Sequence, residues 1–180
     1  MRSIQTIWNY LLAAVLTVFI MTTPAWGSVM SKGAKKDIHR YLEKAPWIGL
    51  IANELTFGPL TISRINIHDG EKFALVAPGE VLEGSLQYSI NAKELSTLHR
   101  YHLVIGIDGE GAQDCVTHTI GICNSKGIGN FKLTAPEKAG IYQVKFMFVE
   151  GLTCSRAQEL WNSGEKEPSS EATIGVIIVE

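Results

Sequence analysis

The chain has 180 residues with 16 Lys+Arg and 18 Asp+Glu, which gives a formal net charge of −2 at pH 7. This balance argues against a nucleic-acid binder, which needs a concentrated basic surface. A hydrophobic fraction of 46% with 19% charged residues argues against a disordered chain. The length suits one domain that can bury its own core.

The first 27 residues have the three parts of a secretory signal peptide. Arg2 supplies the charge, an apolar run extends from Leu11 to Met21, and Ala25 and Gly27 place small residues at positions −3 and −1 of a cleavage site. The apolar run is shorter than the roughly 20 residues that a membrane-spanning helix needs. We therefore expect cleavage after Gly27 and a secreted or periplasmic protein, which contacts the membrane only through the signal peptide before cleavage. A retained membrane anchor is the alternative interpretation.

Residues 28–56 form a lead-in between the signal peptide and the strands. Apolar residues recur at helical spacing from Ile38, which predicts a short helix over 33–44. The stretch 46–51 is apolar but too short to span a membrane. We expect it to plug one end of the core.

From Leu60 onward, apolar and polar residues alternate with a period of two. Glycine and proline separate the alternating segments, and almost no long helix is predicted. This pattern predicts an all-β fold over 57–180, an antiparallel β-sandwich. We expect Lys126–Asn130 to form a turn because no helix follows its glycines. The segments expected as strands are 60–67, 73–76, 82–90, 101–108, 131–134, 142–149 and 174–179.

The turn over 136–142 indicates a particular kind of β-sandwich. Pro136 and Gly140 precede Tyr142 at the start of a predicted strand. The pattern resembles the tyrosine corner of immunoglobulin-like sandwiches, in which the phenol bonds back to the backbone. Val144 stands where an antibody domain has its second core cysteine, so the resemblance implies an immunoglobulin-like domain without the antibody-type core disulfide.

The C-terminal half carries a wider pattern. It comprises Gly111-Ala112-Gln113-x-Cys115, Ala135-Pro136, Gly140-x-Tyr142, Cys154-x-x-Ala157, and Glu167-Pro168 leading to Ala172-Thr173-Ile174-Gly175. This pattern resembles the β-sandwich modules of secreted bacterial proteins over roughly residues 99–179. The resemblance implies a fold and export, and no activity.

Three cysteines follow the signal peptide: Cys115, Cys123 and Cys154. Their spacing is too wide for a typical zinc site, and topology alone allows both Cys115–Cys154 and Cys123–Cys154. The resemblance carries cysteines at positions 115 and 154 and none at 123, so it implies a Cys115–Cys154 disulfide and a free Cys123. A catalytic pair of Cys123 and His118 is the alternative, but no third group that would orient it is visible.

An acidic, glycine-rich loop is expected at 108–114. Asp108, Glu110 and Asp114 could gather around Ca²⁺, which prefers several oxygen ligands. The match to a known calcium loop is poor, and the alternative is a hairpin loop whose glycines adopt positive φ and whose acids face water. We predict no metal site and no cofactor. The five histidines are expected at the surface or at sheet edges.

A long segment, 150–171, separates the last two predicted strands. Residues 154–161 have helical character, with Ser155 as the expected cap. Long connections are often functional, so Trp161 could stack on a sugar or contact a partner. The alternative is that Trp161 covers the open end of the sandwich.

The motifs of the common hydrolases and nucleotide-binding proteins do not occur in the sequence. We therefore expect a non-enzymatic binding or structural module whose partner is an extracytoplasmic protein or a glycan. The alternatives are a calcium- or carbohydrate-binding module and a hydrolase with an unrecognised site.

Overall fold

The computed structural model describes residues 51–95, 99–120 and 124–180, together with Tyr41. Two compact units divide the chain, Met1–Tyr41 and Leu42–Glu180, and the fold described here is that of the second. The predicted signal peptide lies outside the described residues, and so does the predicted helix 33–44 apart from Tyr41, which is helical.

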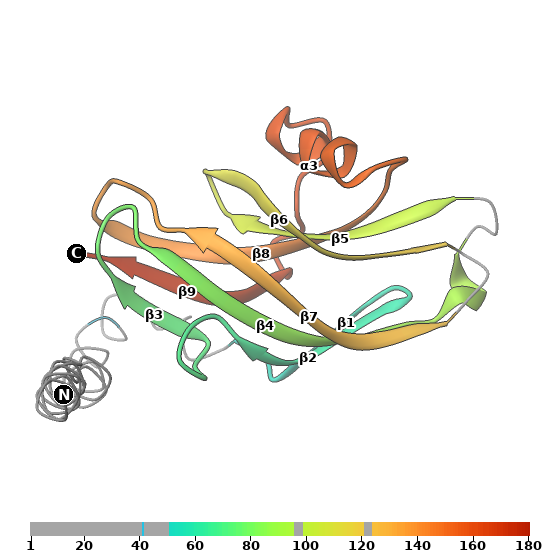
Figure 1. Ribbon diagram of the computed structural model, residues 1–180, viewed down its shortest axis with the longest axis horizontal. Coiled ribbons are helices and arrows are strands. Elements are labelled where there is room, and N and C mark those ends of the chain that lie inside the picture. Colours follow the sequence, from blue (N-terminus) through green and yellow to red (C-terminus); the bar gives the residue numbers. More distant parts are fainter. Residues whose placement is uncertain (1–40, 42–50, 96–98, 121–123) are drawn as a thin grey trace, which may run out of the picture. The chain divides into compact units, whose positions relative to one another are not determined.

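The described residues of this second unit form two β-sheets and one α-helix (Figure 1), which confirms the all-β class. A short 3₁₀ helix, η2, spans Ala92–Glu94. The other elements in chain order are β1 (Glu54–Phe57), β2 (Leu60–Asn66), β3 (Phe73–Val76), β4 (Val81–Ile90), β5 (Arg100–Ile107), β6 (Gly111–Ile120), β7 (Ser125–Thr134), β8 (Gly140–Glu150), α3 (Cys154–Asn162) and β9 (Thr173–Val179).

Strands that follow one another in the sequence often lie in different sheets. The four-stranded sheet has the order β1-β2-β4-β7, and the five-stranded sheet has the order β3-β9-β8-β5-β6. All neighbouring strands are antiparallel except β3 and β9, which run parallel. The chain therefore passes repeatedly from one sheet to the other, and strands that are far apart in sequence become neighbours.

The main core fills the space between the two sheets. The alternation along β4 buries Leu82 and Leu86 and exposes Glu83, as its period of two predicts. In the facing sheet, Ile105 and Phe146 point into the same core with 0% and 1% of their surface exposed. Burial of these side chains is the main source of stability, at about 1.5–3 kcal/mol for each large apolar residue.

A second, smaller core lies on the outer face of the five-stranded sheet, where α3 packs (Figure 1). Val104 of β5 and Met147 and Val149 of β8 are apolar on this face, and the helix turns its own apolar side toward them. The cluster consists of Val104, Met147, Val149, Ala157, Leu160 and Trp161. The five-stranded sheet is therefore buried on both faces in this region.

The structure overturns two expectations about loops and turns. Lys126–Asn130 is not a turn, because it belongs to β7 and pairs with β4. Its glycines make room for neighbours: a Cβ on Gly129 would collide with the side chain of Val116. The loop expected at 108–114 is also shorter than predicted, since β6 begins at Gly111.

Side chains of β6 close one edge of the sandwich. Asp114 Oδ2 accepts a hydrogen bond from the backbone N–H of Lys132 at 2.7 Å. The Gln113 amide accepts from Thr134 N at 2.6 Å and donates to Thr134 O at 3.2 Å. Polar backbone groups of β7 thus find partners on the facing sheet.

Tyr142, at the start of β8, donates a hydrogen bond from its hydroxyl to the backbone carbonyl of Lys138 at 2.8 Å. A Cβ on Gly140 would lie 3.1 Å from the Tyr142 ring, so this glycine allows the ring to approach the backbone closely. We expect Tyr142→Phe to lower the free energy of unfolding by about 1 kcal/mol, the usual net value of one hydrogen bond. Chemical denaturation measures this loss. Lys138→Ala keeps the carbonyl acceptor and is the matched control; equal losses in both variants would show that the hydroxyl contributes nothing.

Candidate functional site

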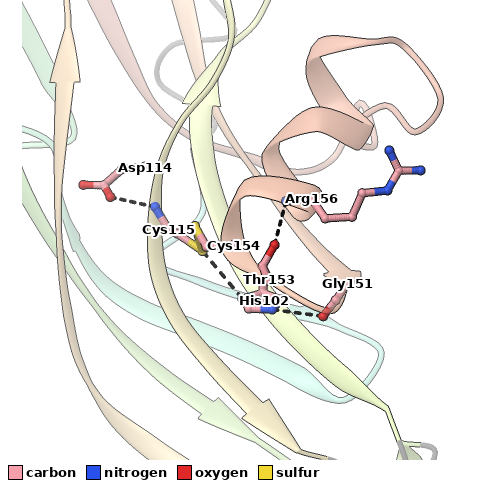
Figure 2. Close-up of a disulfide and its surroundings, with 7 residues drawn as sticks. All are labelled: His102, Asp114, Cys115, Gly151, Thr153, Cys154 and Arg156. Carbon is pink, nitrogen blue, oxygen red and sulfur yellow. Dashed lines mark hydrogen bonds between the residues drawn. A yellow bond between two sulfur atoms is a disulfide. The ribbon is translucent and has the colours of Figure 1, made fainter.

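The candidate site is built around a disulfide between β6 and α3. Cys115 lies in β6 and Cys154 is the first residue of α3, and the structure joins them with their Cα atoms 6.1 Å apart (Figure 2). This is the pairing that the sequence resemblance implies. Cys123, which was predicted to be free, lies outside the described residues.

Both ends of α3 are fixed to β6. At the N-terminal end, the disulfide joins Cys154 to Cys115 of β6. The helix is capped there by Thr153, whose hydroxyl accepts a hydrogen bond from Arg156 N at 3.2 Å. The prediction of Ser155 as the cap is therefore wrong, and the helix begins at the disulfide itself. At the other end, Asn162 Oδ1 accepts a hydrogen bond from Ala112 N at 2.7 Å. The disulfide and this hydrogen bond hold the helix against the sheet.

Trp161 is buried, with 7% of its surface exposed, in the core beneath α3. Its ring packs against the sheet and presents no exposed face for stacking on a sugar or for contact with a partner. The alternative role, as a covering residue, is nearer to the structure. The surface that it covers is the outer face of the five-stranded sheet rather than the end of the sandwich, because β5 and β8 present apolar residues there.

A buried histidine lies beside the disulfide (Figure 2). His102 of β5 is 5% exposed, so the expectation that every histidine lies at the surface or at an edge is wrong for it. Its Nε2 atom is 3.0 Å from the carbonyl oxygen of Gly151, and its Nδ1 atom is 3.7 Å from Cys115 Sγ. A carbonyl only accepts hydrogen bonds, so Nε2 carries the proton and Nδ1 turns its lone pair toward the sulfur.

The surroundings of His102 keep its ring neutral. Burial is the main cause that lowers its pKa, and coulombic interactions with His118 and Arg100 lower it further, while the hydrogen bond to Gly151 acts in the opposite direction. His118 faces His102 across the β5–β6 pair, with the ring centroids 5.9 Å apart. At pH 7 the buried ring is therefore a neutral base.

The three acids of the predicted calcium loop have separate surroundings. Asp108 pairs with the largely buried ammonium group of Lys145 at 2.9 Å. Both oxygens of Asp114 accept backbone hydrogen bonds, from Cys115 N and Lys132 N, each at 2.7 Å. Glu110 is exposed in the β5–β6 turn. Within the described ranges, no group of three or more His, Cys, Asp or Glu residues is placed to hold a metal ion.

The alternative hairpin interpretation of this loop fits the backbone better. Gly109 has φ +83° and Gly111 has φ +98°, values that glycine adopts at little cost. The acids that precede them, Asp108 and Glu110, are exposed to solvent.

A cleft of about 890 Å³ opens where the chain leaves β2 for β3. Arg64 lies in this cleft and has a left-handed backbone, φ +49°, at an irregularity in the β2–β4 pairing. Lys72 also lines the cleft, and its Nζ atom donates hydrogen bonds to Ala52 O at 2.6 Å and to Asn53 Oδ1 at 2.7 Å. Strained non-glycine residues gather at functional sites, so this cleft is a second candidate site. The sequence pattern gives no sign of it, because an arginine in a strand is not expected to be left-handed.

Comparison with known proteins returned no match to a family model, a curated protein or a solved structure. No helix in the described part of the chain is long and apolar enough to cross a membrane.

Proposed function

We propose that this chain is an exported, non-enzymatic binding module with an immunoglobulin-like β-sandwich. The strand order supports the fold assignment: β4 and β7 correspond to strands B and E, and β5, β6, β8 and β9 correspond to strands C, C′, F and G. The hydrogen bond from Tyr142 back to Lys138 is the tyrosine corner at the start of strand F.

The Cys115–Cys154 disulfide supports export, because disulfides persist in oxidising compartments outside the cytoplasm. The apolar N-terminal segment with its cleavage pattern supports the same conclusion. We expect the mature protein to begin at Ser28, and N-terminal sequencing of the exported protein tests this. An intact Met1 on membrane-embedded protein would contradict it.

The observation that carries the binding proposal is the segment between β8 and β9, which the disulfide fixes on the outer face of the G-F-C-C′ sheet. Arg156 forms ion pairs with Glu159 at 3.0 Å and with Glu165 at 2.8 Å, so the outer side of α3 presents an ordered polar surface. Beside it, Leu152 exposes 82% of its surface. An apolar anchor next to ordered charges suits a protein partner, and a pre-organised surface loses less entropy on binding.

Site-specific photo-cross-linking tests this surface. A photoreactive residue in place of Leu152 should give a discrete adduct in cells that export the protein. The matched control is Ile128 of β7, which is also apolar and is 67% exposed, but lies in the other sheet. Adducts from both positions, or from neither, would contradict a binding surface at α3.

The cleft beside Arg64 supports a second candidate function, binding of a small ligand. Its lining combines the arginine with the carboxylates of Glu54 and Glu71. A panel of glycans and small anions followed by thermal shift, with Arg64→Gly as the comparison, tests this alternative.

A further inference from the structure

We propose that Cys115–Cys154 is a thiol–disulfide exchange site in which His102 takes up the proton of the reduced Cys115. The inference is independent of the binding function proposed above. Three features carry it: the contact between His102 and Cys115, the fixed tautomer of that histidine, and the position of Cys154 at the start of a helix.

In the disulfide state, the Nδ1 atom of His102 has a sulfur neighbour but no proton donor there. Nε2 already donates to Gly151, and neither sulfur of a disulfide carries hydrogen. A buried acceptor without a donor is costly. Reduction supplies the missing donor, because the thiol of Cys115 can then hydrogen-bond to Nδ1. This histidine therefore favours the reduced form more than an apolar neighbour would.

The other sulfur also lies where a thiolate is stabilised. Cys154 is the first residue of α3, directly after the cap Thr153. Unpaired N–H groups and the positive end of the helix dipole lower the pKa of a cysteine in such a position. Cys154 is therefore the better leaving group when the disulfide is attacked.

The exchange balances with a low-molecular-weight thiol as the reductant. Its thiolate attacks Sγ of Cys115, the disulfide bond breaks, and Cys154 leaves as a thiolate. A second thiolate attacks the outer sulfur of the mixed disulfide, which releases Cys115 as a thiolate and the small disulfide as product. In the reverse direction, His102 takes the proton of Cys115, the thiolate attacks a small disulfide, and the departing thiolate is protonated. Cys154 then displaces the second small thiol and closes the bond.

The charged and titratable groups around His102 fit this role. His118 from β6 and Arg100 from β5 oppose a positive charge on the ring, which keeps it neutral while the disulfide is intact. From the α3 segment the ring meets the Gly151 carbonyl, and its partner in β8 is the apolar Val149. The Gly151 carbonyl favours a protonated ring in both states, and reduction adds the thiolate of Cys115 as a second group that does so.

The test measures the reactivity of Cys115 as a single thiol. In full-length protein carrying Cys123→Ser and Cys154→Ser, the rate of reaction with oxidised glutathione is followed from pH 5 to 9.5. We expect Cys115 to stay reactive below pH 7. Adding His102→Gln should slow the reaction roughly tenfold at pH 6, because each unit of thiol pKa changes the net rate about threefold. The two rates should converge above pH 9.

Two controls separate this role from a merely structural one. His118→Gln removes a neighbouring ring that opposes a positive charge on His102, so the reaction at pH 6 should be as fast as in the parent or faster, the opposite of the His102→Gln effect. In the Cys115→Ser, Cys123→Ser background, Cys154 is the single thiol, and His102→Gln should not change its rate. Identical pH profiles with and without His102 would overturn the proposal. If the His102→Gln variant does not fold, Cys115 is titrated at 240 nm as the single thiol of the Cys123→Ser, Cys154→Ser protein: no thiolate below pH 7.5 would overturn the proposal equally.

Discussion

Replacing Phe146 by alanine is expected to lower the free energy of unfolding by about 3–5 kcal/mol, the usual cost of deleting a large buried ring. Phe146 is 1% exposed and lies in β8, the central strand of the five-stranded sheet. Its ring also meets that of Phe57 edge-on, with the centroids 5.9 Å apart. The substitution therefore removes contacts to both sheets at once. Urea denaturation at constant pH measures the loss.

The matched control is Leu152→Ala, which removes an apolar side chain that is 82% exposed. Its effect should stay within about 0.5 kcal/mol, as for most surface substitutions. Phe146→Leu should fall between the two, because it keeps part of the buried volume. A Phe146→Ala variant as stable as the Leu152→Ala control would contradict the placement of this ring in the main core.

Removing the disulfide by Cys154→Ser is expected to destabilise the domain by about 2–4 kcal/mol, because the reduced unfolded chain gains conformational freedom. The first amides to lose protection from hydrogen exchange should be those of α3. The helix would still be held by Asn162 and by its apolar face, so it should loosen before the sheets unfold. Reduction of the wild-type protein should have the same effect.

Cys123→Ser is the control for this variant, since the bond joins the other two cysteines. It should leave both stability and hydrogen exchange unchanged. Peptide mapping without reduction gives a separate test of the pairing. A peptide that links Cys123 to either other cysteine, or three free thiols, would contradict the Cys115–Cys154 bond.

Most strands could be predicted from the sequence because one face of each is buried and the other is exposed to solvent, which makes apolar and polar residues alternate. Leu82, Leu86 and Glu83 repeat with a period that only a half-buried strand explains. Where glycines stand at the alternating positions, the alternation of apolar and polar residues no longer identifies a strand. Gly127 and Gly129 indicated a turn, yet they lie in β7 because Tyr88 and Val116 occupy the space that their side chains would fill. Such packing depends on residues distant in sequence.

The candidate site was predicted only in part, for a similar reason. The pairing of Cys115 with Cys154 came from a resemblance and agrees with the structure. The sequence left both an exposed and a covering role open for Trp161, and the burial of His102 was not predicted, because alternation does not tell which outer face of a sheet a helix will cover. His102 lies under α3 only because the chain between β8 and β9 folds back over β5.

The parallel pairing of β3 with β9 has a consequence for the order in which the domain can fold. Val76 of β3 pairs with Val179 of β9, which lies roughly a hundred residues further along the chain. Contacts between residues so far apart in sequence slow folding. β9 also lies between β3 and β8, so the five-stranded sheet is split until this strand arrives. At about 5–20 residues per second of synthesis, the ribosome presents β3 several seconds before β9. During that interval the chain lacks the strand that completes its five-stranded sheet, so β3 cannot join β8 until β9 has been synthesised.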